Sequence, residues 1–118
     1  MPRETSTKPL VFACSGCSFA GKLADDLARH LDQQGEAEIS CLSGIGARRP
    51  SFLAKLRNRE VWVIDACAIE CARGVFEVAG QAQAVTHHIR LHELDITKHH
   101  LPVGLVDLKQ LASDAAKP

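Results

Sequence analysis

Two short runs of wholly apolar residues constrain the fold of this chain most. Residues 10–13 and 61–64 each place four consecutive apolar side chains in a row. Strands without polar alternation are typical of a sheet that is covered on both faces. Between the two runs, Leu23, Leu27 and Leu31 recur at helical spacing, and Gly35 follows as a stop signal. The pattern therefore predicts strands that alternate with helices around a parallel sheet.

The remaining segments extend this pattern along the chain. Residues 38–42 form a weaker second strand, and residues 43–47 a flexible glycine-containing loop. A short helix begins at Pro50, and a longer one runs from about residue 69 to residue 79. Alternation over residues 85–91 predicts an outer strand with one wet face, and residues 104–112 a last short helix. We expect a single three-layer, Rossmann-like α/β domain with a small, mainly parallel sheet of about four strands.

Length and hydropathy set the expected domain limits. A chain of 118 residues is one domain. We expect a flexible arm at residues 1–8, the α/β domain at residues 9–113 and a disordered tail at residues 114–118. The start of the chain is polar and has no apolar signal core, and the longest apolar runs have only strand length. These features predict a cytoplasmic protein that does not enter a membrane.

The charge balance narrows the range of partners. Lys and Arg total 14, and Asp and Glu also total 14, so the chain has no net charge to attract nucleic acid. Four phenylalanines and one tryptophan offer no stacking platform for single-stranded nucleic acid. An apolar stripe near the C-terminus can pack on its own domain or on a second copy of the chain, which would form a homodimer. Its members are Leu105, Leu108 and Leu111.

All five cysteines follow predicted strands. Cys14 and Cys17 follow the first apolar run, Cys41 ends the second strand, and Cys67 and Cys71 follow the third. Sites in open parallel sheets form beyond the carboxyl ends of the strands, where the chain order reverses. We therefore expect the five thiols to converge on one edge of the sheet, although they are far apart in sequence.

Converging cysteines in a reducing compartment predict a soft metal or thiol redox chemistry. The Cys14/Cys17 and Cys67/Cys71 pairs supply four ligands, the number that a closed zinc site uses, and Cys41 lies within reach. Four cysteines can also hold an iron–sulfur cluster. The second pair has three intervening residues, and about fifty residues separate the pairs, so this is not a zinc-ribbon pattern.

Two other readings of the cysteines stay open at this point. Either pair can act in a thiol-based oxidoreductase or sulfur-transfer protein, because a thiol at a helix start is activated as a nucleophile. Alternatively, the cysteines are small buried hydrophobic residues without a chemical role.

The other polar residues near these turns have weaker signals. Asp65 stands two residues before Cys67, and we expect it to orient the loop or cap a helix rather than to act in catalysis. His88, His99 and His100 are predicted to be surface residues. Four basic residues either offset thiolate charge at the same edge or are solvated surface groups: Lys22, Arg48, Arg49 and Arg73.

Several motifs, taken in order, resemble the DGC family, a group of small bacterial proteins expected to bind zinc and named for an Asp-Gly-Cys motif. The matching segments are residues 11–18, 20–24, 40–46, 64–67 and 71–72. The resemblance covers about residues 9–98 and implies zinc binding through cysteines, without supplying a reaction. The namesake motif here is Asp65-Ala66-Cys67. Since alanine tolerates a positive φ poorly, we expect a slightly different loop backbone.

Overall fold

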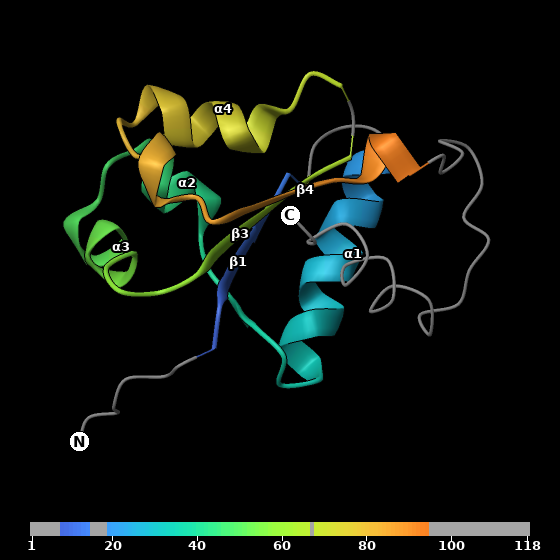
Figure 1. The fold of residues 1–118 in the computed structure, drawn as a ribbon, viewed down its shortest axis with the longest axis horizontal. Coiled ribbons are helices and arrows are strands. Elements are labelled where there is room, and N and C mark those ends of the chain that lie inside the picture. The colour runs from blue at the N-terminus through green and yellow to red at the C-terminus, as the bar shows by residue number, and fades with distance from the viewer. Residues whose placement is uncertain (1–7, 15–18, 67, 95–118) are drawn as a thin grey trace.

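A parallel sheet lies between two layers of helices in a computed structural model, which describes residues 8–14, 19–66 and 68–94. Figure 1 shows α1 on one side of the sheet, with α2, α3 and α4 on the other. In chain order the elements are β1 (Leu10–Ala13), α1 (Phe19–Gln33), β2 (Glu38–Ile39), α2 (Leu42–Gly46), α3 (Pro50–Lys55), β3 (Val61–Asp65), α4 (Cys71–Val78), the 3₁₀ turn η1 (Ala82–Ala84), β4 (His87–Arg90) and the 3₁₀ turn η2 (Leu91–Leu94). The predicted α/β class is confirmed.

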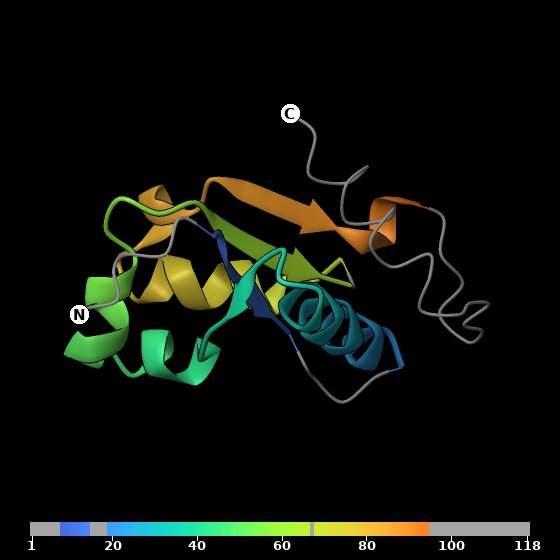
Figure 2. The ribbon, with the colours of Figure 1, turned by 90° about the horizontal axis from the view of Figure 1, so that it is seen from below.

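The strand order is β2-β1-β3-β4, and each neighbouring pair is parallel. In Figure 2 the arrows of β3 and β4 run side by side in the same direction. From β1 the chain moves outward to β2 and then crosses back to β3 on the other side of β1. The chain order therefore reverses between β1 and β3, and sites in such sheets form beyond the carboxyl ends of these two strands.

Alternating side chains of the strands divide the core into two layers. Val11, Ile64 and Ile89 pack against the apolar stripe of α1, which includes Leu27 and Leu31. Leu10, Phe12, Val61 and Val63 face the other way and pack with Ile45, Ala72 and Phe76 of α2 and α4. Both faces of the central strands are covered, which is why β1 and β3 carry no polar residue before their ends.

Three predicted elements differ in extent from the sequence expectation. The second strand has only two residues, and the expected loop at residues 43–47 is largely the short helix α2. The helix expected from residue 69 begins at Cys71. The helix expected at residues 104–112, the tail and most of the N-terminal arm lie outside the described residues. No helix in the described part of the chain is both long and apolar enough to span a membrane.

Glu38 links the start of β2 to basic residues at the opposite, amino-terminal edge of the sheet. Its carboxylate lies 2.9 Å from Arg59 Nη2 and 3.6 Å from Lys55 Nζ. The Arg59 hydrogen bond lowers the pKa of Glu38, and this outweighs the partial burial that raises it. The folded pKa is thus below the ordinary value of 4.5, so this interaction stabilises the folded state above that pH and is lost as the pH falls through the folded pKa.

Glu38→Gln is therefore expected to flatten the acid side of the stability profile. Below the ordinary glutamate pKa, wild-type stability should fall more steeply than that of the variant, and the difference between them should shrink. Urea unfolding of reduced protein at a series of pH values measures this. Two profiles that stay parallel throughout the acid range would contradict the role of Glu38.

Candidate functional site

Cys14 lies at the carboxyl edge, next to the end of β3. Its backbone N–H donates to the carbonyl of Ile64 at 3.2 Å, which continues the β1–β3 ladder past Ala13. The next residue of β3 is Asp65, and neighbouring strands lie about 4.8 Å apart. The Cys14 side chain is half-buried and packs on the α2–α4 face of the sheet. Cys14 therefore occupies the switch point that the topology creates.

Cys41 follows β2 at the same edge and caps α2. Ser40 still donates its N–H to Val11 of β1, so Cys41 directly follows the paired residues. The Cys41 Sγ accepts a hydrogen bond from the Gly44 N–H at 3.3 Å. Gly44 is buried, and a Cβ at this position would lie within 2.9 Å of three Phe52 ring atoms. Close packing against Phe52 thus favours glycine here, and the segment is a helix, not the predicted flexible loop.

Cys71 is the first residue of α4, and its side chain is exposed. Like Cys41, it is a free thiol. Cys17 and Cys67 lie outside the described residues. Within residues 8–14, 19–66 and 68–94, no three His, Cys, Asp or Glu side chains are close enough together to hold a metal ion. The described cysteines therefore share one edge of the sheet, but they do not make a complete ligand set by themselves.

Asp65 joins the end of β3 to the start of α4. It is 1% exposed. Its Oδ1 accepts from the Ala72 N–H at 2.8 Å, and its Oδ2 accepts from the Arg73 N–H at 3.1 Å. These N–H groups belong to the first turn of α4 and have no partner within the helix. The predicted capping role of Asp65 is confirmed, although Asp65 is six residues ahead of Cys71.

The Asp65 cap changes the expected electrostatics of Cys71. A helix N-terminus favours a thiolate when its N–H groups are open to the sulfur. Here two of those N–H groups already donate to a buried carboxylate. These two N–H groups are therefore engaged by Asp65 and are not open to the Cys71 sulfur.

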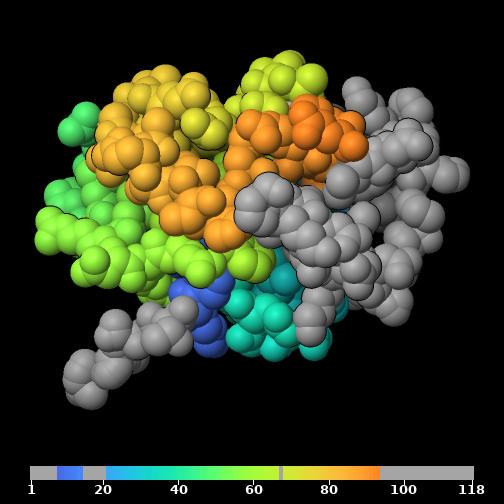
Figure 3. Space-filling model, viewed as in Figure 1, coloured from blue at the N-terminus to red at the C-terminus, as the bar shows by residue number. Residues whose placement is uncertain are grey.

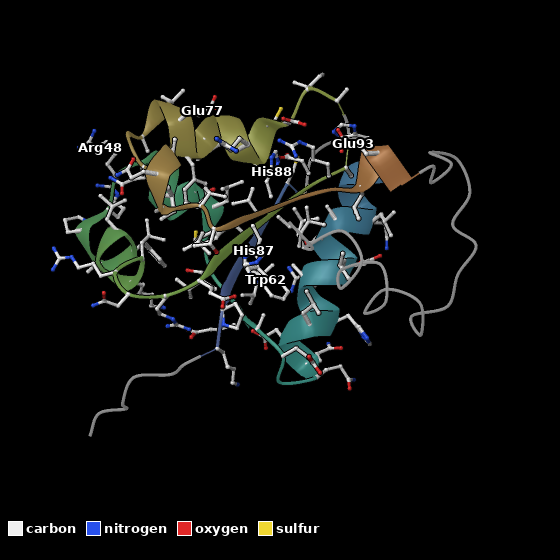
Figure 4. The ribbon with its side chains drawn as sticks, viewed as in Figure 1. Arg48, Trp62, Glu77, His87, His88 and Glu93 are labelled. Atoms are coloured by element: carbon white, nitrogen blue, oxygen red, sulfur yellow. The ribbon has the colours of Figure 1, made fainter. Side chains whose placement is uncertain are left out.

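His88 is buried, and the prediction that it is a surface residue is wrong. Its side chain is 6% exposed, and its Nε2 lies 2.8 Å from Asp65 Oδ2. Figure 4 shows His88 beside the first turn of α4. A carboxylate only accepts hydrogen bonds, so the hydrogen of this bond is on Nε2. The Nδ1 atom is buried and has no hydrogen-bond partner among the described residues. His88 faces α4 because β4 presents alternate residues to opposite sides of the sheet.

Glu70 stands directly before Cys71 in a left-handed backbone conformation, with φ 56° and ψ 52°. For a residue with a Cβ, this conformation costs about 1–2 kcal/mol. The Glu70 carboxylate lies 3.0 Å from Arg90 Nε and 3.0 Å from His92 Nε2. Burial raises the pKa of Glu70, whereas the hydrogen bonds from His92 and Arg90 lower it, and the net shift is downward.

The alanine of the Asp65-Ala66-Cys67 motif fits this backbone. In the described part of the chain, the non-glycine residues with positive φ are Arg48, Asn58 and Glu70, and Ala66 is not one of them. The expected effect of losing the motif's glycine on the loop is therefore absent at Ala66 itself.

The basic residues expected near the thiolates are mostly engaged with acids or exposed elsewhere. Lys22 pairs with Asp26 at 2.7 Å, and Arg73 lies 3.5 Å from Glu77. Arg48 and Arg49 are exposed between α2 and α3. Of the four, only Arg73 belongs to the first turn of α4.

The sequence predictions missed Glu70, Arg90 and His92, and misplaced His88. The sequence did contain one pattern that indicates ion pairs between these residues. Residues 88, 90 and 92 are all basic at a spacing of two, and two acids, Asp65 and Glu70, flank Cys67. That spacing places side chains on one face of a strand. Only the tertiary structure shows that His88 on that face is covered, with its ring against Asp65, whereas the Arg90 side chain stays 39% exposed.

A shallow, largely apolar groove runs beside Cys71 between α2 and α4. Its volume is about 450 Å³, and it is lined by Gly46, Ile69, Glu70, Cys71, Gly74, Val75 and Val78. Ile69 is 79% exposed and Val78 is 87% exposed. An exposed thiol and exposed aliphatic side chains therefore share one stretch of surface.

Comparison with known proteins identifies the family. Residues 10–114 match the DGC domain. A curated relative, "Anaerobic and virulence modulator AnvM" from Pseudomonas aeruginosa, is 38% identical over 93 residues, which cover 78% of this chain and 70% of the relative. No solved structure matches the chain significantly. The order of motifs, the described cysteines at the carboxyl edge and these matches agree, and the chain belongs to the DGC domain family.

Proposed function

We propose that this protein binds zinc through cysteine thiolates at the carboxyl edge of its sheet. The observation that carries the proposal is the position of Cys14, Cys41 and Cys71, which follow β1, follow β2 and begin α4 at that edge. Thiolates are soft ligands that select zinc and similar metals. The donor set fits zinc in kind, since the chain contains two cysteine pairs and a closed zinc site uses four ligands.

The ligands we assign are Cys14, Cys17, Cys67 and Cys71. The described pair of these, Cys14 and Cys71, lies on the α4 face of the sheet, and the other two complete the set. We assign Cys41 a position beside the site, because the two cysteine pairs already supply the four ligands of a closed zinc site and the Cys41 sulfur caps α2. When bound, zinc would tie β1, β3 and α4 together, and its binding would add to folding stability.

Cysteine substitutions test the ligand assignment. Protein purified without chelator should contain about one zinc per chain by elemental analysis. Cys14→Ser and Cys71→Ser should each lower zinc affinity by at least about 100-fold, since even residues behind the ligands are worth about 10–100-fold. Cys41→Ser is the matched control and should stay within about threefold of wild type. Folded wild-type protein that contains no metal would overturn the proposal.

Two chemical alternatives give different results with the same protein. A thiol-based oxidoreductase or sulfur-transfer protein would form a reversible Cys14–Cys17 or Cys67–Cys71 disulfide after mild oxidation, which peptide mass spectrometry detects. The exposure of the Cys71 thiol is the observation that favours this alternative. An iron–sulfur cluster would colour the protein, whereas zinc absorbs no visible light. Stoichiometric colourless metal with no readily formed disulfide supports zinc.

The relative's name suggests a biological setting for such a site. A protein named as an anaerobic and virulence modulator acts in regulation. In this chain, a regulatory role would follow from thiolate chemistry. A peroxide that accepts two electrons would join two ligand thiolates as a disulfide and be reduced to water or alcohol, and these two sulfurs would then no longer hold a bound metal as thiolates. Zinc release that tracks disulfide formation, measured with a zinc-binding dye, would support this role, and retention of zinc after disulfide formation would count against it.

A further inference from the structure

Two buried or half-buried carboxylates bracket the segment that leads into α4. Asp65 is the last residue of β3, and Glu70 is the last residue before the helix. Asp65 holds the helix N–H groups of Ala72 and Arg73. Glu70 lends no side-chain cap to the helix, and its carboxylate turns instead toward β4 and η2. Asp65 and Glu70 thus make contacts with different partners, Asp65 with the first turn of α4 and Glu70 with β4 and η2.

Both carboxylates are bound from the same side by residues of β4 and η2. His88 and Arg90 alternate on one face of β4, and His92 follows in η2. Asp65 and Arg90 are partners in the β3–β4 register. His88 donates to Asp65, whereas Arg90 and His92 contact Glu70. In Figure 3 the residues ahead of α4 lie directly beside η2, in agreement with these contacts.

The backbone conformation of Glu70 is energetically unfavourable for a residue that has a side chain. A glutamate adopts left-handed φ and ψ at an energetic cost that glycine avoids. Nothing in the Glu70 side chain caps the helix locally. The Glu70 side chain instead makes its two contacts, each at 3.0 Å, with Arg90 and His92, which can offset that cost.

We propose that these five residues form a two-point clamp that positions Cys71 against the sheet edge. Asp65 with His88 is one point, and Glu70 with Arg90 and His92 is the other. They are positioning residues, because each acts on the cysteine site through the backbone at the start of α4. The importance of the clamp for metal binding rests on the zinc function proposed above, but its effect on α4 does not.

The histidine point of the clamp is tested by a pair of variants. His88→Gln keeps an N–H donor that can reach Asp65 and lacks the lone pair of Nδ1, whereas His88→Ala removes both. In zinc-free reduced protein, His88→Ala should raise hydrogen exchange at the Ala72 and Arg73 amides by about tenfold or more. His88→Gln should remain near wild type. If His88→Gln loosens these amides as much as His88→Ala does, His88 does not act through Asp65 and this point of the clamp is wrong.

The glutamate point is tested with Glu70→Ala and Glu70→Gly, and Glu77→Gln is the control on the same helix. Glycine relieves the left-handed strain but cannot contact Arg90 or His92. Under the clamp, both Glu70 variants speed exchange at Ala72 and Arg73, whereas the Phe76 amide and Glu77→Gln stay at wild-type rates. Exchange at Ala72 that is unchanged in both variants, or that rises equally at Phe76, would overturn the clamp.

Zinc affinity supplies an independent readout of the same variants. We expect Glu70→Ala and His88→Ala to weaken zinc binding by about tenfold, the lower end of the effect of residues behind metal ligands. Unchanged zinc affinity in both variants would show that the clamp does not affect metal binding at the cysteine site. If wild-type protein binds no zinc, the proposed function fails, while the exchange measurements still decide whether the clamp holds α4.

Discussion

Asp65→Ala is expected to lower the free energy of unfolding by about 3–5 kcal/mol. The substitution leaves His88 Nε2–H and the amides of Ala72 and Arg73 without their acceptor in a buried site. Removing one partner of a buried polar network leaves the others desolvated and unpaired, which is more costly than the loss of one exposed hydrogen bond. Urea unfolding of reduced, zinc-free protein measures the change.

Two control variants test whether the loss of stability comes from the buried hydrogen bonds of Asp65. Asp65→Asn keeps one acceptor oxygen and should therefore lose less stability than Asp65→Ala. Asp25→Ala removes a half-buried carboxylate that pairs with the exposed Arg29 one turn along α1, and such pairs contribute about 0.3–0.5 kcal/mol. If Asp65→Ala destabilises the protein no more than Asp25→Ala, the buried network does not anchor α4.

Phe76→Ala is expected to lower the free energy of unfolding by a similar amount, about 3–5 kcal/mol. Phe76 is fully buried and meets the Phe12 ring edge to face, with centroids 5.0 Å apart and planes at 81°. These two rings join the middle of α4 to β1, the strand that leads to Cys14. The loss combines the transfer of the ring to water with the cavity that remains between helix and sheet.

Val78→Ala is the matched control for Phe76. Val78 lies two residues further along α4 and is 87% exposed, so its truncation should change stability by less than about 0.5 kcal/mol. Thermal unfolding of both variants beside wild type gives the comparison. Equal effects from the two substitutions would contradict the core position of Phe76.

The two large effects describe how α4 is attached. Phe76 fastens the helix to the sheet through apolar burial, and Asp65 fixes its first turn through hydrogen bonds. Cys71 sits at the end of α4 where the Asp65 hydrogen bonds and the Glu70 contacts meet, and Phe76 attaches the helix further along. The backbone of this helix end is therefore anchored, although the Cys71 side chain itself is exposed.

Local pattern was sufficient for the main architecture. The apolar runs at residues 10–13 and 61–64 predict buried strands, and the apolar stripe of α1 predicts a helix with one buried face. In the structure this helix face packs against those strands. Once these elements form a parallel sheet, the ends of its strands meet at one edge. The neighbouring positions of Cys14 and Asp65, and the place of Cys41 beside them, could therefore be predicted from the order of elements.

Helix α2 could not be predicted in this way. Two glycines in five residues oppose a helix locally, and the ring of Phe52, which comes from α3, packs where any larger side chain at Gly44 would collide. Tertiary packing overrides propensity here. The contact joins residues of two different helices, so it cannot be predicted from the helix propensities of residues 42–46.

Within the site, His88 and Glu70 are likewise residues whose positions could not be predicted from local sequence. The sequence by itself determined the alternation of strands and helices and the placement of Cys14, Cys41 and Cys71 at one edge, since both depend on apolar periodicity along the chain. Only the tertiary structure decided that the His88 ring is buried against Asp65 and that Glu70 takes a left-handed turn toward Arg90 and His92. Those outcomes depend on hydrogen bonds between residues about twenty positions apart, and they form only after the sheet has brought β3 and β4 together.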